Sequence, residues 1–125
     1  MPKTPTSPHD FIPLTPPVFH ILLAISDGAR HGYAIIKEVE VRSQGDVMLS
    51  TGTLYAAIKR LLGDGLIQET DSGKAMVNVD ERRRYYRLTA LGRKVARAEV
   101  NRMIELVHVA EEKRLVRNVA LARGR

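Results

Sequence analysis

The spacing of apolar residues predicts a short amphipathic helix over residues 51–63. At about 100° per residue, one third of the helical circle collects the apolar stripe: Leu54, Ile58, Leu61 and Leu62. The opposite side is small near its start and cationic further along: Gly52, Ala56, Lys59 and Gly63, with Thr53 and Arg60 beside them. Ser50 is the expected N-cap, and Gly63 with Gly65 should end the helix.

The helix expected over residues 16–26 is apolar on almost every side. Thr15-Pro16-Pro17 is a typical helix start, because proline in the first turn gives up an N–H that has no helical partner. The apolar set is Val18, Phe19, Ile21, Leu22, Leu23 and Ile25. Such a helix needs to be buried on more than one side. One side should meet the chain's own core, and the other suggests a partner subunit.

Between these two helices the pattern predicts a further helix over residues 31–42, with Ile35, Ile36 and Val39 facing inward. Residues 43–46 have turn chemistry, and residues 47–49 would suit a very short strand. Downstream, residues 66–70 and 82–88 alternate as two strands of a hairpin with a long polar loop. Leu88 should point inward with Tyr86 and Arg84, leaving Arg83, Tyr85 and Arg87 on the other face.

The last helix is expected from Ala90 to about Asn118, with Thr89 as its cap. An apolar seam repeats along it at spacings of four and three residues, as in a short coiled coil: Ala96, Val100, Met103, Val107 and Ala110. A helix of nearly 30 residues would be about 45 Å long, more than a core of this size can cover. Its far half should therefore pack against another subunit, although packing on its own domain is the alternative.

The order of these elements predicts a winged helix-turn-helix: a mainly α fold with a small β-hairpin and a long C-terminal dimerisation helix. All six prolines lie in the first 17 residues, so residues 1–13 are expected to form a flexible arm. Residues 14–89 would form the DNA-binding domain, and residues 90–121 the dimerisation helix.

Composition excludes several function classes. The 125-residue chain has no cysteine, and its four histidines lack metal-ligand spacing. Neither a nucleophile motif nor a glycine-rich phosphate loop is present, so we expect no enzyme, no cofactor and no metal. The longest nearly apolar run, residues 18–25, is too short to span a membrane, and no secretory signal is evident. A cytoplasmic location is expected.

Charge favours a polyanionic partner. The net charge is +6, and ten basic against five acidic residues lie between positions 50 and 97. A solvated basic surface would explain the charge alone, but the small, cationic helix face and the arginine-rich hairpin converge on one partner. Small residues allow close approach to a groove, and Lys or Arg pair with phosphates or base edges.

The chain also resembles the PadR family of transcriptional regulators. The matching segments cover about residues 14–95: Leu14-Thr15-Pro16-Pro17, His31-Gly32-Tyr33 with Ile35-Ile36-Lys37, Gly52-Thr53-Leu54-Tyr55, Arg60-Leu61 with Gly65-Leu66-Ile67, and Arg83-Arg84-Tyr85-Tyr86-Arg87-Leu88-Thr89 with Leu91-Gly92. The resemblance implies a homodimeric repressor whose last helix joins the first in dimerisation. The family often has proline where this chain has Ala56, which implies a changed contact there. The single last helix resembles the family's short-tailed group.

The predicted sites follow from both lines of reasoning. The DNA-binding set is Tyr33, Ser50, Thr51, Gly52, Thr53, Tyr55, Lys59, Arg60, Lys74, Arg82 and Arg83. The dimer set is Val18, Phe19, Leu22, Ala96, Val100, Met103, Val107 and Ala110. The resemblance gives Tyr33 and Tyr55 phosphate contacts, whereas the residues alone would equally suit half-buried tyrosines with a wet tip.

The leading functional prediction is a dimeric, sequence-specific repressor that binds an inverted-repeat operator in double-stranded DNA. A small-molecule effector at the dimer interface is a further expectation drawn from the family, and its identity is open. The alternative is a winged-helix interaction module whose basic wing binds an acidic protein.

Overall fold

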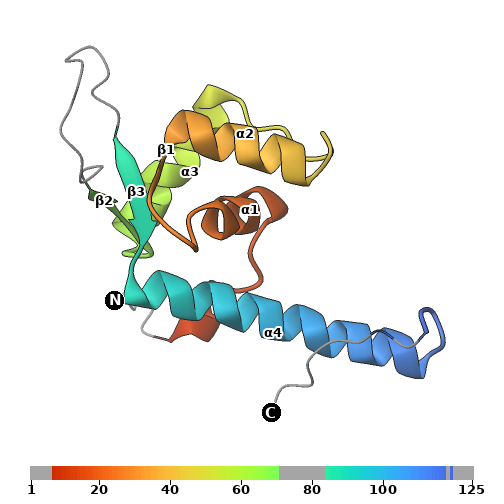
Figure 1. The fold of residues 1–125 in the computed structure, drawn as a ribbon. Coiled ribbons are helices and arrows are strands. Elements are labelled where there is room, and N and C mark those ends of the chain that lie inside the picture. Colours follow the sequence, from red (N-terminus) through yellow and green to blue (C-terminus); the bar gives the residue numbers. More distant parts are fainter. Residues whose placement is uncertain (1–6, 71–83, 118, 120–125) are drawn as a thin grey trace.

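The computed structural model describes residues 7–70, 84–117 and 119. Their elements, in chain order, are η1 (Pro8–Phe11), α1 (Pro16–Ala24), β1 (Arg30–His31), α2 (Gly32–Arg42), α3 (Thr51–Gly63), β2 (Ile67–Thr70), β3 (Tyr85–Leu88) and α4 (Ala90–Glu112). Figure 1 shows α1 between α2 and α4, with the small sheet at one end of the molecule. The predicted fold class, a mainly α winged helix-turn-helix with a long last helix, is confirmed.

The helix boundaries follow the local signals that the sequence carries. Thr15 accepts the N–H of Val18 at the start of α1, and Ser50 accepts the N–H of Thr53 at 3.0 Å at the start of α3. Gly65 takes the left-handed conformation just after α3, with φ +78°, which glycine adopts without steric cost.

The sheet departs from the prediction at its first strand. The expected strand over residues 47–49 is wrong: those residues form a loop, and Leu49 is buried in the core instead. The short strand is β1, which pairs antiparallel with β3 through Arg30 and His31. Because β3 also pairs with β2, it lies in the centre of a three-stranded sheet. The predicted hairpin strands pair with each other as expected. β1 covers the other edge of β3, which the hairpin alone would leave unpaired.

The last helix is shorter than predicted, because it ends at Glu112 rather than near residue 118. Arg114 adopts a left-handed φ of +65°, and the N–H of Leu115 reaches back to the carbonyl of Ala110 at 2.9 Å, a pairing that closes helix C-termini. At 23 residues, α4 is about 35 Å long.

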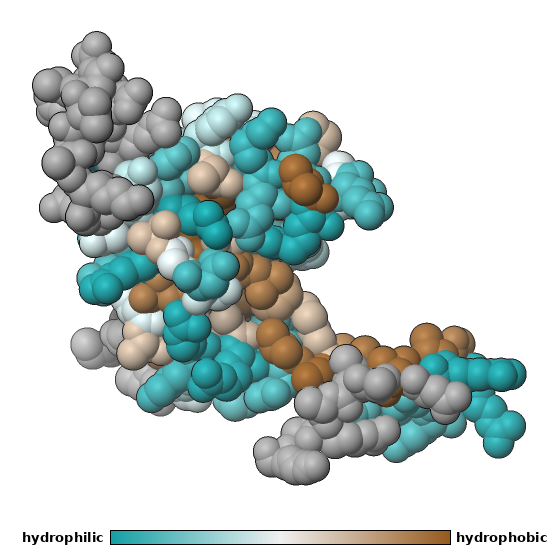
Figure 2. Space-filling model, viewed as in Figure 1, coloured by the Kyte–Doolittle hydropathy of each residue, from teal (hydrophilic) through white to brown (hydrophobic). Residues whose placement is uncertain are grey.

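The second half of α4 projects beyond the rest of the fold (Figure 1). Figure 2 shows hydrophobic side chains along the edge of this projecting half that faces α2. From Val100 to Glu112 no residue of the helix is buried, and Leu106 leaves 54% of its surface exposed.

The expected flexible arm is wrong for residues 7–13, whereas residues 1–6 lie outside the described part. Ser7 and Asp10 cap the η1 turn reciprocally, and Phe11 and Ile12 pack against the core. Glu99 of α4 then accepts the N–H of Leu14 at 3.2 Å. Apolar side chains among the prolines thus attach this segment beneath α4.

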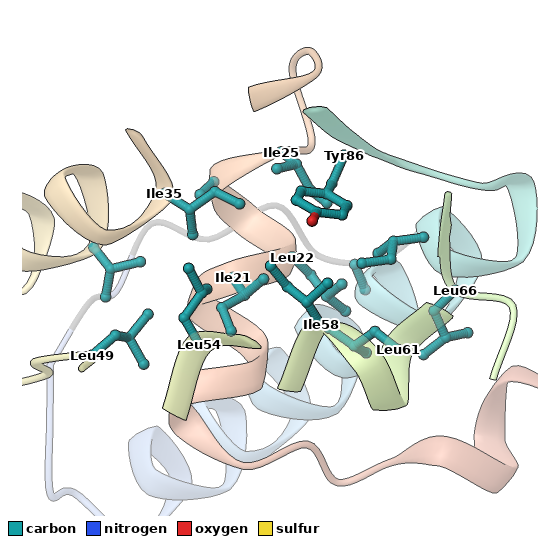
Figure 3. Close-up of a cluster of buried hydrophobic side chains, with 14 of the residues drawn as sticks. Ile21, Leu22, Ile25, Ile35, Leu49, Leu54, Ile58, Leu61, Leu66 and Tyr86 are labelled. Atoms are coloured by element: carbon teal, nitrogen blue, oxygen red, sulfur yellow. The ribbon is translucent and has the colours of Figure 1, made fainter. Parts of the chain in front are cut away.

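The core gathers aliphatic side chains from α1, α2, α3 and the start of α4, with Tyr86 entering from β3 (Figure 3). Ile35 and Val39 are fully buried, as predicted, and Ile36 is half-buried. Within the described ranges, no helix is both long enough and apolar enough to cross a lipid bilayer.

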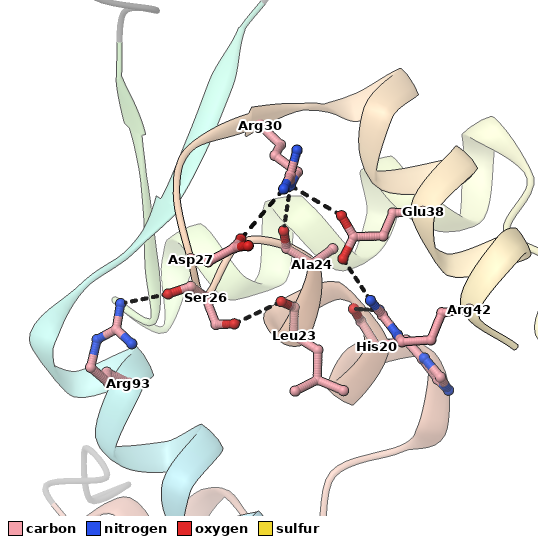
Figure 4. A network of polar contacts seen from close by, with 9 residues as sticks. All are labelled: His20, Leu23, Ala24, Ser26, Asp27, Arg30, Glu38, Arg42 and Arg93. Carbon is pink, nitrogen blue, oxygen red and sulfur yellow. Dashed lines mark hydrogen bonds and ion pairs between the residues drawn. The ribbon is translucent and has the colours of Figure 1, made fainter.

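A polar network fixes α1 against α2 (Figure 4). Glu38 pairs with Arg30 at 3.1 Å and with Arg42 at 2.6 Å. Arg30 also donates to the carbonyl of Ala24 at 2.7 Å, and Arg42 donates to the carbonyl of His20 at 2.9 Å. Both arginines therefore bridge the two helices, and the frame that carries α3 is held by charge-assisted hydrogen bonds as well as by its core.

Candidate nucleic-acid interface

One side of α3 is open and the other is buried, as the sequence pattern predicted. Leu54, Ile58 and Leu61 are buried, while the outward residues are all exposed: Thr51, Gly52, Thr53, Tyr55, Ala56, Lys59 and Arg60. The first turn of this outward side carries only small side chains. The helix backbone can therefore approach a flat or grooved partner closely at that end.

The hydroxyl of Ser50 is committed to the start of α3. It accepts the N–H of Thr53 and donates to the hydroxyl of Thr53 at 2.9 Å. Ser50 therefore acts as the predicted N-cap, and Thr53 keeps a hydroxyl hydrogen for another acceptor.

The exposed cations of α3 differ from the arginines that carboxylates hold in the fold. Arg30, Arg42 and Arg102 are all ion-paired, and Arg84 lies 3.5 Å from Glu69. For Lys59 and Arg60, by contrast, no described residue supplies an ion pair or hydrogen bond. Their charge remains available to an anionic partner.

The four tyrosines divide into two environments. Tyr33 and Tyr55 leave 64% and 44% of their surfaces exposed, one on each helix of the helix-turn-helix unit. Tyr86 is buried, and this burial raises the pKa of its phenol. Tyr85 meets the ring of His31 edge-on, with ring centres 5.4 Å apart. Tyr33 and Tyr55 are therefore the two most exposed tyrosines, and Tyr86 is the one that burial withdraws from a partner.

The wing is described at its base. β2 pairs Gln68 with Arg87 and Ile67 with Leu88, and the alternation is as predicted, with Tyr86 inward and Arg87 exposed. Arg84 departs from its expected core-facing place because it precedes the strand and is exposed. The predicted wing residues Lys74, Arg82 and Arg83 lie outside the described residues.

The predicted dimer residues fall into two groups. Leu22 is fully buried and Ala96 nearly so, both in the chain's own core. The prediction is wrong for these two, because neither has surface left for a partner. The others keep accessible surface in the single chain: Val18, Phe19, Val100, Met103, Val107 and Ala110.

The sequence interpretation missed the structural roles of two residues. His31 caps α2 by accepting the N–H of Ala34 at 3.2 Å, although serine or threonine is the usual signal. Glu99 is fully buried and pairs with Arg102 at 2.8 Å. Its signal was its place on the same helical face as Ala96 and Met103, where a carboxylate needs a buried partner.

Solved structures share this fold. A transcriptional regulator from Clostridium thermocellum is 26% identical, with a TM-score of 0.62, over 80% of this chain and 90% of that one. A PadR-family transcription regulator from Clostridium difficile is 25% identical, with a TM-score of 0.64, over 78% and 96%. RosR from H. salinarum, 23% identical with a TM-score of 0.60 over 86% and 100%, shows the fold alone.

Sequence comparison gives a relative and a family. An uncharacterised protein from Lysinibacillus sphaericus is 33% identical over 78 residues, which are 58% of this chain and 64% of that protein. The chain thus spans less than two thirds of that relative's length. The family model of the PadR-like transcriptional regulators matches residues 21–98, more than half of the chain and all of the described helix-turn-helix unit. The chain belongs to the PadR-like family of transcriptional regulators.

Proposed function

We propose that the protein is a dimeric, sequence-specific DNA-binding regulator that represses transcription from an inverted-repeat operator. The observation that carries this proposal is the outward side of α3. Lys59 and Arg60 are exposed there and unpaired within the described residues, next to a first turn of small side chains. In a winged helix-turn-helix this helix is the one that enters the major groove.

The DNA contacts divide by chemistry. Gly52 and Thr53 at the start of α3 allow the backbone to approach base edges, while Lys59 and Arg60 bind phosphates or guanines. Tyr33 and Tyr55 donate their hydroxyls to phosphates beside the groove. Ser50 and Thr51 support the same end of α3, and the wing contributes Lys74, Arg82 and Arg83.

The proposed dimer rests on the projecting half of α4. That half has no buried residue in the single chain, yet it carries Val100, Met103, Leu106, Val107 and Ala110. Apolar surface of this extent on one helix is stabilised when a second copy covers it. Val18 and Phe19 of α1 add to the same interface. Two copies related by a two-fold axis would read half-sites about 34 Å apart.

Repression follows from occupancy, because a dimer bound across both half-sites excludes other proteins from that stretch of duplex. An effector that changes the angle between the two α4 helices would alter the spacing of the two α3 helices and release the DNA.

Selection of bound duplexes from a random pool by the purified full chain tests the proposal. We expect one enriched inverted repeat. Enrichment of no sequence, together with tight binding to an acidic protein, would favour the alternative interaction module. Salt dependence on random DNA would not separate the two, because the phosphate contribution is sequence-independent.

A further inference from the structure

Gly32, the first residue of α2, lies against the phenol of Tyr55, which comes from α3. It is buried, and its backbone takes no left-handed angle, so its conformation alone does not require glycine. The requirement is spatial. A Cβ placed there would lie 2.9 Å from Cζ of Tyr55 and 3.2 Å from Cδ2 of Leu54, with the Tyr55 hydroxyl closer still.

The two neighbours differ in how they can respond. Leu54 is fully buried, and a contact of 3.2 Å to one of its methyl groups requires that side chain to shift by a few tenths of an ångström. The phenol of Tyr55 is the far end of a side chain that is 44% exposed, so it can rotate into solvent. Described residues supply no hydrogen bond to its hydroxyl that would hold it in place.

We propose that Gly32 is a positioning residue for DNA binding, because it leaves room for the phenol of Tyr55 beside the first turn of α2. The phenol occupies the space that a side chain at residue 32 would fill. β1 runs directly into Gly32 and pairs with β3, so this contact also fixes the phenol relative to the base of the wing. Gly32 acts through Tyr55 and touches no DNA itself.

This inference rests on the proposed function, and it makes a separable prediction. Gly32→Ala should leave the chain folded, since the group that must move most is the far end of a partly exposed side chain. The displaced phenol should lose its phosphate contact. A hydrogen bond to a charged group is strong enough that its loss should weaken operator binding about tenfold.

The experiment measures thermal unfolding and affinity for one selected duplex with four full-length proteins: wild type, Gly32→Ala, Tyr55→Ala and the double variant. We expect Gly32→Ala to keep its melting temperature within a few degrees and to bind about tenfold more weakly. In the Tyr55→Ala background it should cause no further loss, because the residue through which it acts is gone. Gly63→Ala is the matched control for the melting temperature, since a Cβ at Gly63 meets nothing within 4 Å.

Each other outcome overturns a distinct statement. If wild type binds the duplex and Gly32→Ala binds equally well, the positioning role is wrong and the proposed function stands. A Gly32→Ala chain that does not fold would assign the glycine to packing alone. Additive losses in the double variant would show that Gly32 acts independently of Tyr55. If wild type enriches no duplex at all, the proposed function fails and this inference with it.

Discussion

At the scale of single residues, the fold separates charges that hold the structure from charges that face outward. Arg30 and Arg42 form ion pairs with Glu38 and donate hydrogen bonds to carbonyls of α1. Lys59 and Arg60 form no ion pair or hydrogen bond with any described residue. A count of basic residues in the sequence cannot make this distinction, because it depends on which carboxylates lie within reach after folding.

Replacing either cation of α3 should weaken operator binding. Lys59→Ala and Arg60→Ala are each expected to cost about 1–3 kcal/mol where the side chain contacts a base. A cation that contacts only phosphate should instead lower the salt slope by about one unit. Titration of the selected duplex at several salt concentrations measures both effects. Lys113→Ala removes one cation from the distal end of α4; it is the control and should bind as wild type. Unchanged binding by both α3 variants would show that residues other than Lys59 and Arg60 recognise the DNA.

Glu99 gives the fold an acid-sensitive attachment. The paired Arg102 guanidinium, aided by the N–H of Leu14, outweighs burial and lowers the pKa of this carboxyl below its ordinary value of 4.5. A depressed pKa means that the carboxylate stabilises the fold at pH values above 4.5, and that this stabilisation is lost as pH falls through the folded-state pKa.

Glu99→Gln should therefore lower the free energy of unfolding at pH 7 by about 1–3 kcal/mol. The difference in unfolding free energy between variant and wild type should shrink as the pH falls from 4.5 through the lower folded-state pKa. The wild-type carboxyl then becomes protonated and, like the glutamine, carries no charge. Urea unfolding at a series of pH values measures this. A difference that stays constant down to the acid limit would contradict the assigned role.

At the scale of elements, α4 is joined tightly to the turn that follows α3. Thr89 donates its hydroxyl to the carbonyl of Gly65 at 2.6 Å and its N–H to the carbonyl of Leu66 at 3.0 Å. Gly92 lets α4 approach that same turn, since a Cβ there would lie 2.9 Å from the carbonyl carbon of Leu66. A movement of α4 would therefore be passed to the end of α3.

Gly92→Ala should be more damaging than Gly32→Ala, because the obstructing atoms at Gly92 are backbone and cannot rotate away. We expect a loss of about 2 kcal/mol or more in the free energy of unfolding, as for other overpacked core sites. Gly63→Ala provides the comparison and should be neutral or slightly stabilising. Denaturant unfolding of the three proteins is the measurement, and equal stability of Gly92→Ala and wild type would refute the close approach.

Local signals in the sequence predicted α1, α2, α3 and the two wing strands, because caps, glycines and apolar periods act over a few residues. Three features could not be predicted from such signals. β1 exists only because β3 offers an open edge, η1 is ordered by packing under α4, and α4 ends early at the left-handed Arg114. Of the candidate site, the side of α3 was predictable from its spacing, whereas the burial of Leu22 depends on tertiary contacts.

At the scale of the whole molecule, the single chain leaves the projecting half of α4 without a partner, and we propose a second copy there. Val107→Glu should place a charge in that interface and shift the protein to monomer at micromolar concentration. Asn101→Glu adds the same charge at an exposed position of the same helix and should leave the assembly unchanged. Sedimentation velocity distinguishes the two states, and a Val107→Glu variant that remains dimeric would refute this interface.

In the proposed complex, two copies of α3 enter successive major grooves on one side of a duplex. Hydroxyl-radical footprinting of the full chain on its selected duplex tests it most directly. We expect two protected half-sites of inverted sequence, centred about one helical turn apart and lying on one face. Protection that is uniform along the duplex, or a single protected half-site at saturation, would rule out this arrangement of the two α3 helices.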